Sequence, residues 1–263
     1  MKKIMVILIG LLVFAFSGCA GGSIELNGDD ISGVVLPVPP ETGDIPSTEE
    51  QEKNKKTYII SNAQGLRIRS GAGANYAVIG NLEKQDALLY TGKVGEYYTT
   101  VYKEKTGYVH SAYCSLFTVD THTDKTEKAI DFGMTLLGYP YVWGSERYHW
   151  GNGKLNSNFI NGQFDCSAFV QYIYYKTSGV LLDVTSRAQS LEGELVSSDD
   201  LQRGDLMFFT NASRKDKVGI EKVGHVGIYF GDNYILHTAS DYAVLEPISQ
   251  TRWGYYLHAR RVV

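Results

Sequence analysis

Cysteine is scarce in this chain, which limits the ways in which the fold can be held together. The 263 residues contain three cysteines, at positions 19, 114 and 166, and only six prolines. Three cysteines are too few to stabilise a small disulfide-rich domain. The sequence also lacks the CxxC and HExxH patterns that are typical of zinc sites. A hydrophobic core must therefore stabilise the fold, and 43% hydrophobic residues are enough to form one.

The chain also lacks an excess of basic residues. It has 25 Lys and Arg against 29 Asp and Glu, which gives a formal net charge of −4. Proteins that bind nucleic acid usually present a clustered basic face, so no nucleic-acid partner is expected.

The one long apolar run stands at the N-terminus. Lys2 and Lys3 precede an apolar stretch over residues 4–16, which is shorter than the roughly 20 residues of a membrane-spanning helix. This pattern predicts a signal peptide over residues 1–18. The tetrad that ends at Cys19 resembles the lipobox of bacterial lipoproteins, although Leu is usual where this chain has Phe16. The resemblance implies a lipidated Cys19 and a membrane anchor, and an ordinary signal peptide is the alternative.

Composition divides the rest of the chain into three parts. Residues 19–56 are rich in Gly, Pro, Ser, Thr and Glu, which predicts a disordered tether. Residues 57–118 alternate short apolar segments with turns, which predicts a small all-β domain. Its strands are expected at Leu66–Arg69, Ala77–Gly80, Ala87–Tyr90, Tyr97–Val101 and Gly107–Val109. Residues 124–263 mix both patterns, with a helix expected over 126–137, and predict an α+β domain.

The C-terminal part combines a cysteine with two histidines. Apolar residues follow Cys166 with helical spacing as far as Gly179, so Cys166 is expected in the first turn of a helix capped by Asp165, where backbone amides favour a thiolate. His225 and His237 flank the turn 231–233, which predicts a hairpin with both rings on one face. A thiol needs a base to become a nucleophile near neutral pH. We therefore expect His225 to be that base and His237 to orient it.

Five motifs follow one another in a fixed order across this part of the chain. They are Tyr141-Val142-Trp143-Gly144, Asp165-Cys166-Ser167, Gly204-Asp205, His225-Val226-Gly227-Ile228-Tyr229 and His237. In this order they resemble the NlpC-type cell-wall endopeptidases, a papain-like family of cysteine peptidases. The resemblance implies a papain-like fold and a peptidase without a cofactor. It implies a substrate as well, the stem peptides of peptidoglycan, which the family commonly cuts between γ-D-glutamate and meso-diaminopimelate or lysine.

The resemblance also implies a role for each matching residue. The family's catalytic residues fall on Cys166, His225 and His237. Its oxyanion and substrate-binding residues fall on Tyr141, Asp165, Ser167 and Ser186, and the aspartate at the place of Asp165 helps to bind a substrate amine. The Pro-Arg pair that is usual before Ser186 is Asp183-Val184 here, which is a departure from the family pattern.

Two further segments are open to more than one interpretation. Residues 145–163 connect two motifs at greater length than in many relatives, and they form either a lid over the site or a tolerated surface insertion. Residues 211–224 carry four basic side chains, and a solvated loop is favoured over a binding surface for acidic wall polymers.

The all-β part carries a resemblance of its own. The runs 65–71, 75–80 and 106–109 resemble a bacterial SH3-like domain. This family implies a cell-wall-binding or substrate-gating module, with a purely structural barrel as the alternative. Together the motifs predict an exported monomer that acts on peptidoglycan, anchored on the outer face of the cytoplasmic membrane or held in the envelope. The alternatives are a zinc hydrolase, a papain-like amidase or acyltransferase, and a non-catalytic wall-binding lipoprotein.

Overall fold

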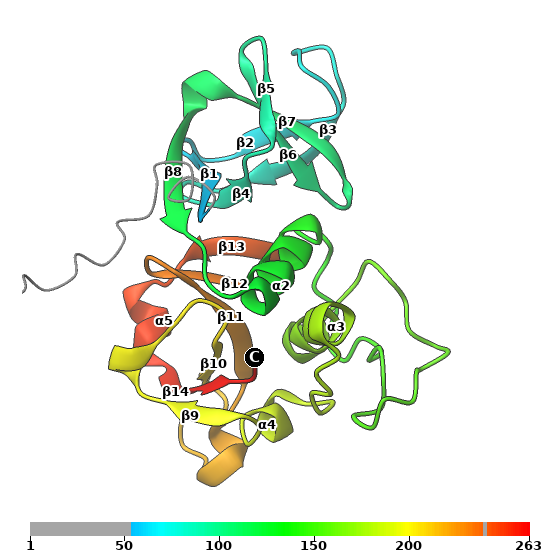
Figure 1. Cartoon of the computed structure of the whole chain (residues 1–263), viewed down its shortest axis with the longest axis vertical. Coiled ribbons are helices and arrows are strands. Elements are labelled where there is room, and N and C mark those ends of the chain that lie inside the picture. The colour runs from blue at the N-terminus through cyan, green and yellow to red at the C-terminus, as the bar shows by residue number, and fades with distance from the viewer. Residues whose placement is uncertain (1–53, 239–240) are drawn as a thin grey trace, which may run out of the picture. The chain divides into compact units, whose positions relative to one another are not determined.

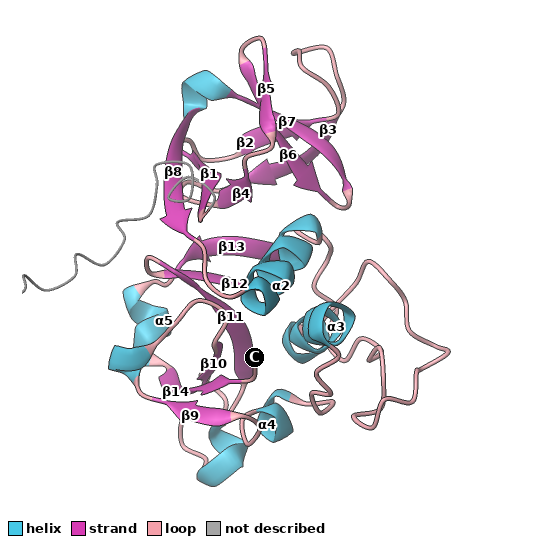
Figure 2. Ribbon diagram, in the orientation of Figure 1, coloured by secondary structure: helices cyan, strands magenta, loops and turns pink. Residues whose placement is uncertain are grey.

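The computed structural model describes residues 54–238 and 241–263, which all belong to one structural unit. Figure 1 follows the chain through this unit, and Figure 2 marks its helices and strands. The predicted signal peptide, Cys19 and almost all of the predicted tether lie outside the described residues. In the described part, the structure has no helix long and apolar enough to cross a membrane.

The first part of the described chain forms an all-β domain of two antiparallel sheets. One sheet has the order β4 (Ala87–Leu89), β1 (Lys55–Ser61) and β8 (Cys114–Asp120). The other has the order β3 (Val78–Leu82), β2 (Leu66–Arg69), β7 (Lys105–His110), β6 (Tyr97–Tyr102) and β5 (Gly92–Val94), and the short 3-10 helix η1 (Ser111–Tyr113) leads into β8. Buried Leu66 and Ile68 alternate with exposed Arg67 along β2, as a strand with one face toward a core requires.

Each of the five predicted strands of this domain has a counterpart, whereas β1, β5 and β8 were not predicted. Strand β1 pairs with β8 along its whole length, from Lys55 opposite Asp120 to Ser61 opposite Cys114. This pairing joins the two ends of the domain, and local alternation does not reveal it. Cys114 consequently begins a strand and is half-buried.

The second part is an α+β domain around a six-stranded antiparallel sheet. Its order is β13 (Ala243–Pro247), β12 (Tyr234–Thr238), β11 (His225–Gly231), β10 (Leu206–Phe209), β14 (Tyr256–Arg261) and β9 (Glu194–Val196). Helices α2 (Asp124–Thr135) and α3 (Cys166–Ser178) pack against each other, and α3 packs on β11 and β12 (Figure 1). The short helices are α4 (Ser186–Gln189), η2 (Ser198–Asp200), η3 (Gly219–Lys222) and α5 (Gln250–Gly254).

Local signals explain where the two long helices begin and end. Asp165 caps α3 by accepting a hydrogen bond from the amide of Ala168, and Gly179 ends the helix with φ 69°. The side chain of Thr123 caps α2, so this helix begins two residues before the predicted start. The α3 boundaries match the sequence prediction because both signals lie within the helix's own segment.

A buried arginine joins the two domains. Arg203 donates to the Glu127 carboxylate at 2.7 Å and to the Tyr58 hydroxyl on β1 at 2.7 Å. It also donates to the carbonyl of Phe230 at 2.7 Å, and its guanidinium lies 4.0 Å from the centre of the Phe230 ring. Lys56 adds a second cation at 3.0 Å from Glu127. The apolar core is continuous across the same boundary, so the small domain packs as part of the whole unit.

Candidate active site

The two histidines meet on one face of the hairpin β11–β12. The turn between the strands places Asp232 and Asn233 at φ 49° and 62°, the left-handed pair that a tight hairpin turn needs. A Cβ atom on Gly227 would come within 2.9 Å of the Cβ of His237, so only glycine leaves room for that side chain. The result is a distance of 2.8 Å between Nε2 of His225 and Nδ1 of His237.

A carboxylate sets the tautomers of both rings. Glu246 on β13 has Oε1 3.0 Å from Nε2 of His237 and 2.9 Å from Nη2 of Arg252. An ionised carboxylate only accepts, so His237 carries its proton on Nε2 and its Nδ1 is an acceptor. His225 must then donate from its own Nε2. This leaves Nδ1 of His225 with a free lone pair, the form that a general base requires.

The protonation states fit this chain of hydrogen bonds. Burial lowers the pKa of His225 well below 6.5, and the neighbouring His237 and Arg252 lower it further. Burial also lowers the pKa of His237, against the opposing effect of its bond to Glu246. Burial opposes ionisation of Glu246 as well, but its contacts with His237 and Arg252 outweigh burial and hold its pKa below 4.5. Near neutral pH, both rings are neutral and the carboxylate is charged.

Cys166 is the first residue of α3 and is buried. The backbone amides of Val226, which follows His225 on β11, and of Ser167 donate toward its sulfur. Burial nevertheless raises the pKa of this thiol to about 11, with Asp165 adding to the effect. The amides at the helix start act in the expected direction and favour the thiolate, but in this state desolvation outweighs them. Among the described residues, no hydrogen bond joins the sulfur to an imidazole.

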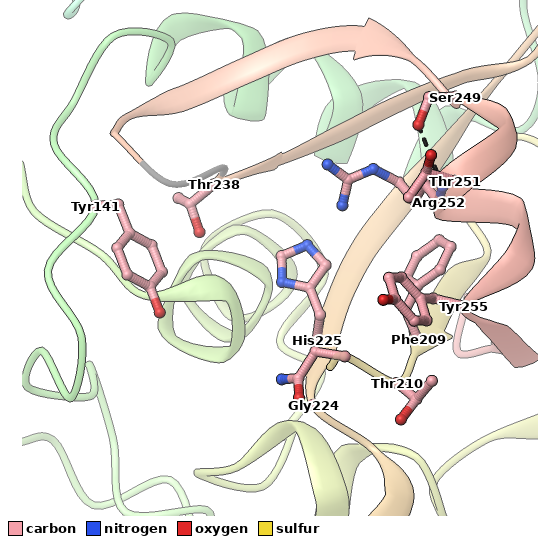
Figure 3. A pocket seen from close by; sticks show the side chains of 11 residues that line it. Tyr141, Phe209, Thr210, Gly224, His225, Thr238, Ser249, Thr251, Arg252 and Tyr255 are labelled. Atoms are coloured by element: carbon pink, nitrogen blue, oxygen red, sulfur yellow. Dashed lines mark hydrogen bonds between the residues drawn. The ribbon is translucent and has the colours of Figure 1, made fainter. Parts of the chain in front are cut away.

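Two adjoining cavities bring the cysteine and the histidines to one cleft. The first, about 530 Å³, is lined by His225, Thr238 and Arg252 among others, and in Figure 3 Tyr141 faces His225 across it. The second, about 470 Å³, is lined by Cys166 and Asp165 among others. Both include Tyr141, Asn211 and Gly224 in their walls. A substrate that fills both cavities would contact the Cys166 thiol and the His225 imidazole at the same time.

Comparison with protein families assigns both domains. The model of the NlpC/P60 family matches residues 138–262, and that of the bacterial SH3 domain matches residues 64–115. The α+β part is an NlpC/P60 domain. A bacterial SH3 domain precedes it in the chain, so the family resemblance and the fold class predicted from the sequence are confirmed.

Two named relatives each match a little more than half of this chain. The peptidoglycan DL-endopeptidase CwlO of Bacillus licheniformis is 31% identical over 57% of this chain and 31% of its own length. A gamma-D-glutamyl-L-lysine dipeptidyl-peptidase of Bacillus cereus is 33% identical over 54% of this chain and 38% of its own length. A solved NlpC/P60 family protein of Bacillus cereus is 22% identical over 81% of this chain and 65% of that chain, with a TM-score of 0.41. This chain thus spans about a third of the length of the two curated relatives.

The other predicted site residues of the NlpC/P60 domain lie in the walls of the second cavity. Burial, together with nearby Cys166 and Asp165, raises the pKa of Tyr141, so its hydroxyl stays protonated and can donate. Ser186 begins α4 and is 9% exposed. Ser167 is buried, and its hydroxyl already donates to Asp165 at 3.0 Å.

The long connection 145–163 of the NlpC/P60 domain packs on α3. The Tyr148 ring contacts those of Tyr172 and Phe159, and the amide of His149 donates to Gln171 at 3.4 Å. This connection carries Arg147, whose Nη2 lies 2.9 Å from Oδ2 of Asp165.

Sequence reasoning gave no role to Arg147 or to Glu246. The signal for Glu246 was a lone charged residue in the apolar run Ala243-Val244-Leu245-Glu246. The sequence offered no comparable signal for Arg147.

Proposed function

We propose that this protein is a peptidoglycan hydrolase, a cysteine endopeptidase that cuts stem peptides between γ-D-glutamate and the diamino acid. One observation carries the proposal: a cysteine at a helix start and an oriented, neutral imidazole line adjoining cavities of one cleft. The names of the two curated relatives refer to a DL-endopeptidase and to a γ-D-glutamyl-L-lysine bond, which supports the substrate class.

The proposed reaction begins with proton transfer from the Cys166 thiol to Nδ1 of His225. The sulfur attacks the amide carbonyl, and the backbone amide of Cys166 and the Tyr141 hydroxyl donate to the developing oxyanion. His225 then protonates the leaving amine, and the C–N bond breaks to give a thioester. Water activated by His225 hydrolyses the thioester and regenerates the thiol. His237 keeps the His225 ring in the required tautomer throughout.

The rest of the chain fits an enzyme of the cell envelope. We propose that the SH3 domain binds the wall beside the site, and that lipidated Cys19 anchors a monomer to the outer face of the cytoplasmic membrane. The resemblance of the first 19 residues to a lipoprotein leader supports the anchor. Its test is metabolic labelling with a fatty acid in the producing cell, with Cys19→Ser expected to abolish the label.

The decisive test of the activity is digestion of purified peptidoglycan, followed by mass spectrometry of the products. We expect fragments that end in γ-D-glutamate and complementary fragments that begin with the diamino acid. Cys166→Ala should abolish both, whereas Cys114→Ala, at the half-buried cysteine of the SH3 domain, should leave turnover unchanged. Retained turnover in Cys166→Ala would overturn the proposal.

The same digests separate the alternatives. A cut at the bond between the sugar's lactyl group and L-alanine would identify an amidase. Activity that is lost with a chelator and restored by zinc would favour a zinc hydrolase. A wild-type protein that binds the wall without releasing fragments would be the non-catalytic alternative.

A further inference from the structure

Arginine dominates the charged lining of the candidate cleft. Asp165 is the one carboxylate among the described residues that line its two cavities. Arg147, Arg187 and Arg214 line the cavity that contains Cys166. The last two are 3.5 and 3.1 Å from Glu221, an exposed residue that does not line either cavity. This end of the cleft therefore has more guanidinium than carboxylate groups, which is unfavourable for a substrate ammonium group.

Every acceptor position of the Asp165 carboxylate is occupied within the protein. Oδ1 accepts from the Ala168 amide at 2.9 Å and from the Ser167 hydroxyl at 3.0 Å. Oδ2 accepts from the Gly144 amide at 3.2 Å and from Arg147 at 2.9 Å. A carboxylate offers about four lone-pair positions, so none is left for a substrate donor. The side chain is only 8% exposed, which also bars an approach from solvent.

Arg147 is held rigidly in this position. Its Nε donates to the carbonyl of Val184 at 2.5 Å, Nη1 donates to the carbonyl of Ser145, and Nη2 donates also to the Ser167 hydroxyl at 3.1 Å. The side chain is 14% exposed. A buried cation with four acceptors around it does not leave readily for a competing ammonium group, because both charges would lose their partners.

We propose that Arg147 is a specificity-determining residue that takes the place of a substrate ammonium group at Asp165. The cleft then accepts stem peptides whose amino end is acylated, as in the intact wall, and discriminates against released peptides with a free amino end. This inference rests on the proposed function and narrows its substrate class. It departs from the role that the family resemblance implies for Asp165, and it gives the connection 145–163 a purpose other than that of a lid.

The test compares two substrates that differ only at the amino end: L-Ala-γ-D-Glu-diamino acid-D-Ala with a free amine, and the same peptide N-acetylated. Each is made with meso-diaminopimelate and with lysine. For the wild-type full chain we expect kcat/KM for the acetylated peptide to exceed that for the free peptide by about tenfold or more. Arg147→Gln frees one acceptor position on Oδ2 of Asp165 and removes the cation, so the preference should fall about tenfold or reverse. Arg147→Lys keeps the cation and should retain the wild-type order.

Lys154→Gln is the matched control, because it removes one positive charge from an exposed position of the same connection and should leave the preference unchanged. Equal or better cleavage of the free peptide by the wild-type protein would overturn the inference without the need for any variant. An Arg147→Gln protein that loses activity on both peptides in equal proportion would overturn it as well, since Arg147 would then be merely structural. Failure of the wild-type protein on all four peptides and on intact wall would instead overturn the proposed function.

Discussion

Oε1 of Glu246 lies 3.0 Å from Nε2 of His237, so the hydrogen-bonded chain that ends at His225 begins at a carboxylate on a third strand. An acceptor-only group at one end of the chain fixes the direction of every hydrogen bond in it. His225, the proposed base, is therefore oriented by a residue that does not touch it.

Glu246→Gln should lower kcat by roughly 10- to 100-fold with little change in KM, because a charge-assisted bond worth about 1.5–3 kcal/mol is lost from the relay. Glu246 raises the pKa of His237, which is the hydrogen-bond partner of His225. Without Glu246 the pair of rings should take up a proton only at lower pH, so the acid limb of the pH profile should move to lower pH. The measurement is steady-state kinetics across pH on the acetylated peptide. A pH profile identical to that of the wild type would show that Glu246 does not position the imidazoles.

The pH dependence of the wild-type protein should reflect a base with a depressed pKa. His225 acts when neutral and is inactivated when it gains a proton. Burial lowers its pKa, so protonation occurs only at pH values well below 6.5, and kcat/KM should stay level down to that region. An acid limb centred at or above 6.5 would contradict the assignment of His225 as a buried neutral base.

Thiol alkylation should be slow in the absence of substrate. With the pKa of Cys166 raised to about 11, iodoacetamide at pH 7 should modify it roughly 100-fold more slowly than an ordinary exposed thiol. The rate should rise about tenfold per pH unit through pH 9. Mass spectrometry of the peptide that contains Cys166 separates it from Cys114, whose pKa is raised by burial to about 12. A rate that levels off below pH 8 would indicate a preformed thiolate–imidazolium pair.

Arg203→Ala should lower the free energy of unfolding by about 3–5 kcal/mol, because Glu127 and the Tyr58 hydroxyl lose a buried partner. The exposed Arg67 is the control, and Arg67→Ala should change stability by less than about 0.5 kcal/mol. Urea unfolding followed by fluorescence and by circular dichroism measures both changes. If the unfolding transitions seen by fluorescence and by circular dichroism coincide in the wild type but separate in Arg203→Ala, this arginine couples the two domains. Transitions that coincide in Arg203→Ala and are not shifted from the wild type would contradict that role.

The parts of the site that the sequence predicted well depend on neighbouring residues. The cap at Asp165 and the stop at Gly179 lie in one segment, as do the two left-handed residues that turn the histidine hairpin. The roles of Cys166, His225 and His237 remain predictions, although the structure brings both rings together. The contact that sequence reasoning missed, between Glu246 and His237, joins two different strands. Glu246 reaches His237 only because β13 pairs with β12 in the register that sets His237 opposite Val244, which makes Glu246 a diagonal neighbour on the same face.

The sequence alone determined the two kinds of domain, their order and the chemical groups available, because strand alternation, helix caps and turn residues act over a few positions. Tertiary structure decided the protonation states and the ion-pair partners of those groups. It buried Cys166 deeply enough to keep the thiol protonated, and it placed Arg147 against Asp165. Burial and ion pairing depend on which distant segments pack together, and the charge on a side chain follows the solvent and partners that packing leaves to it.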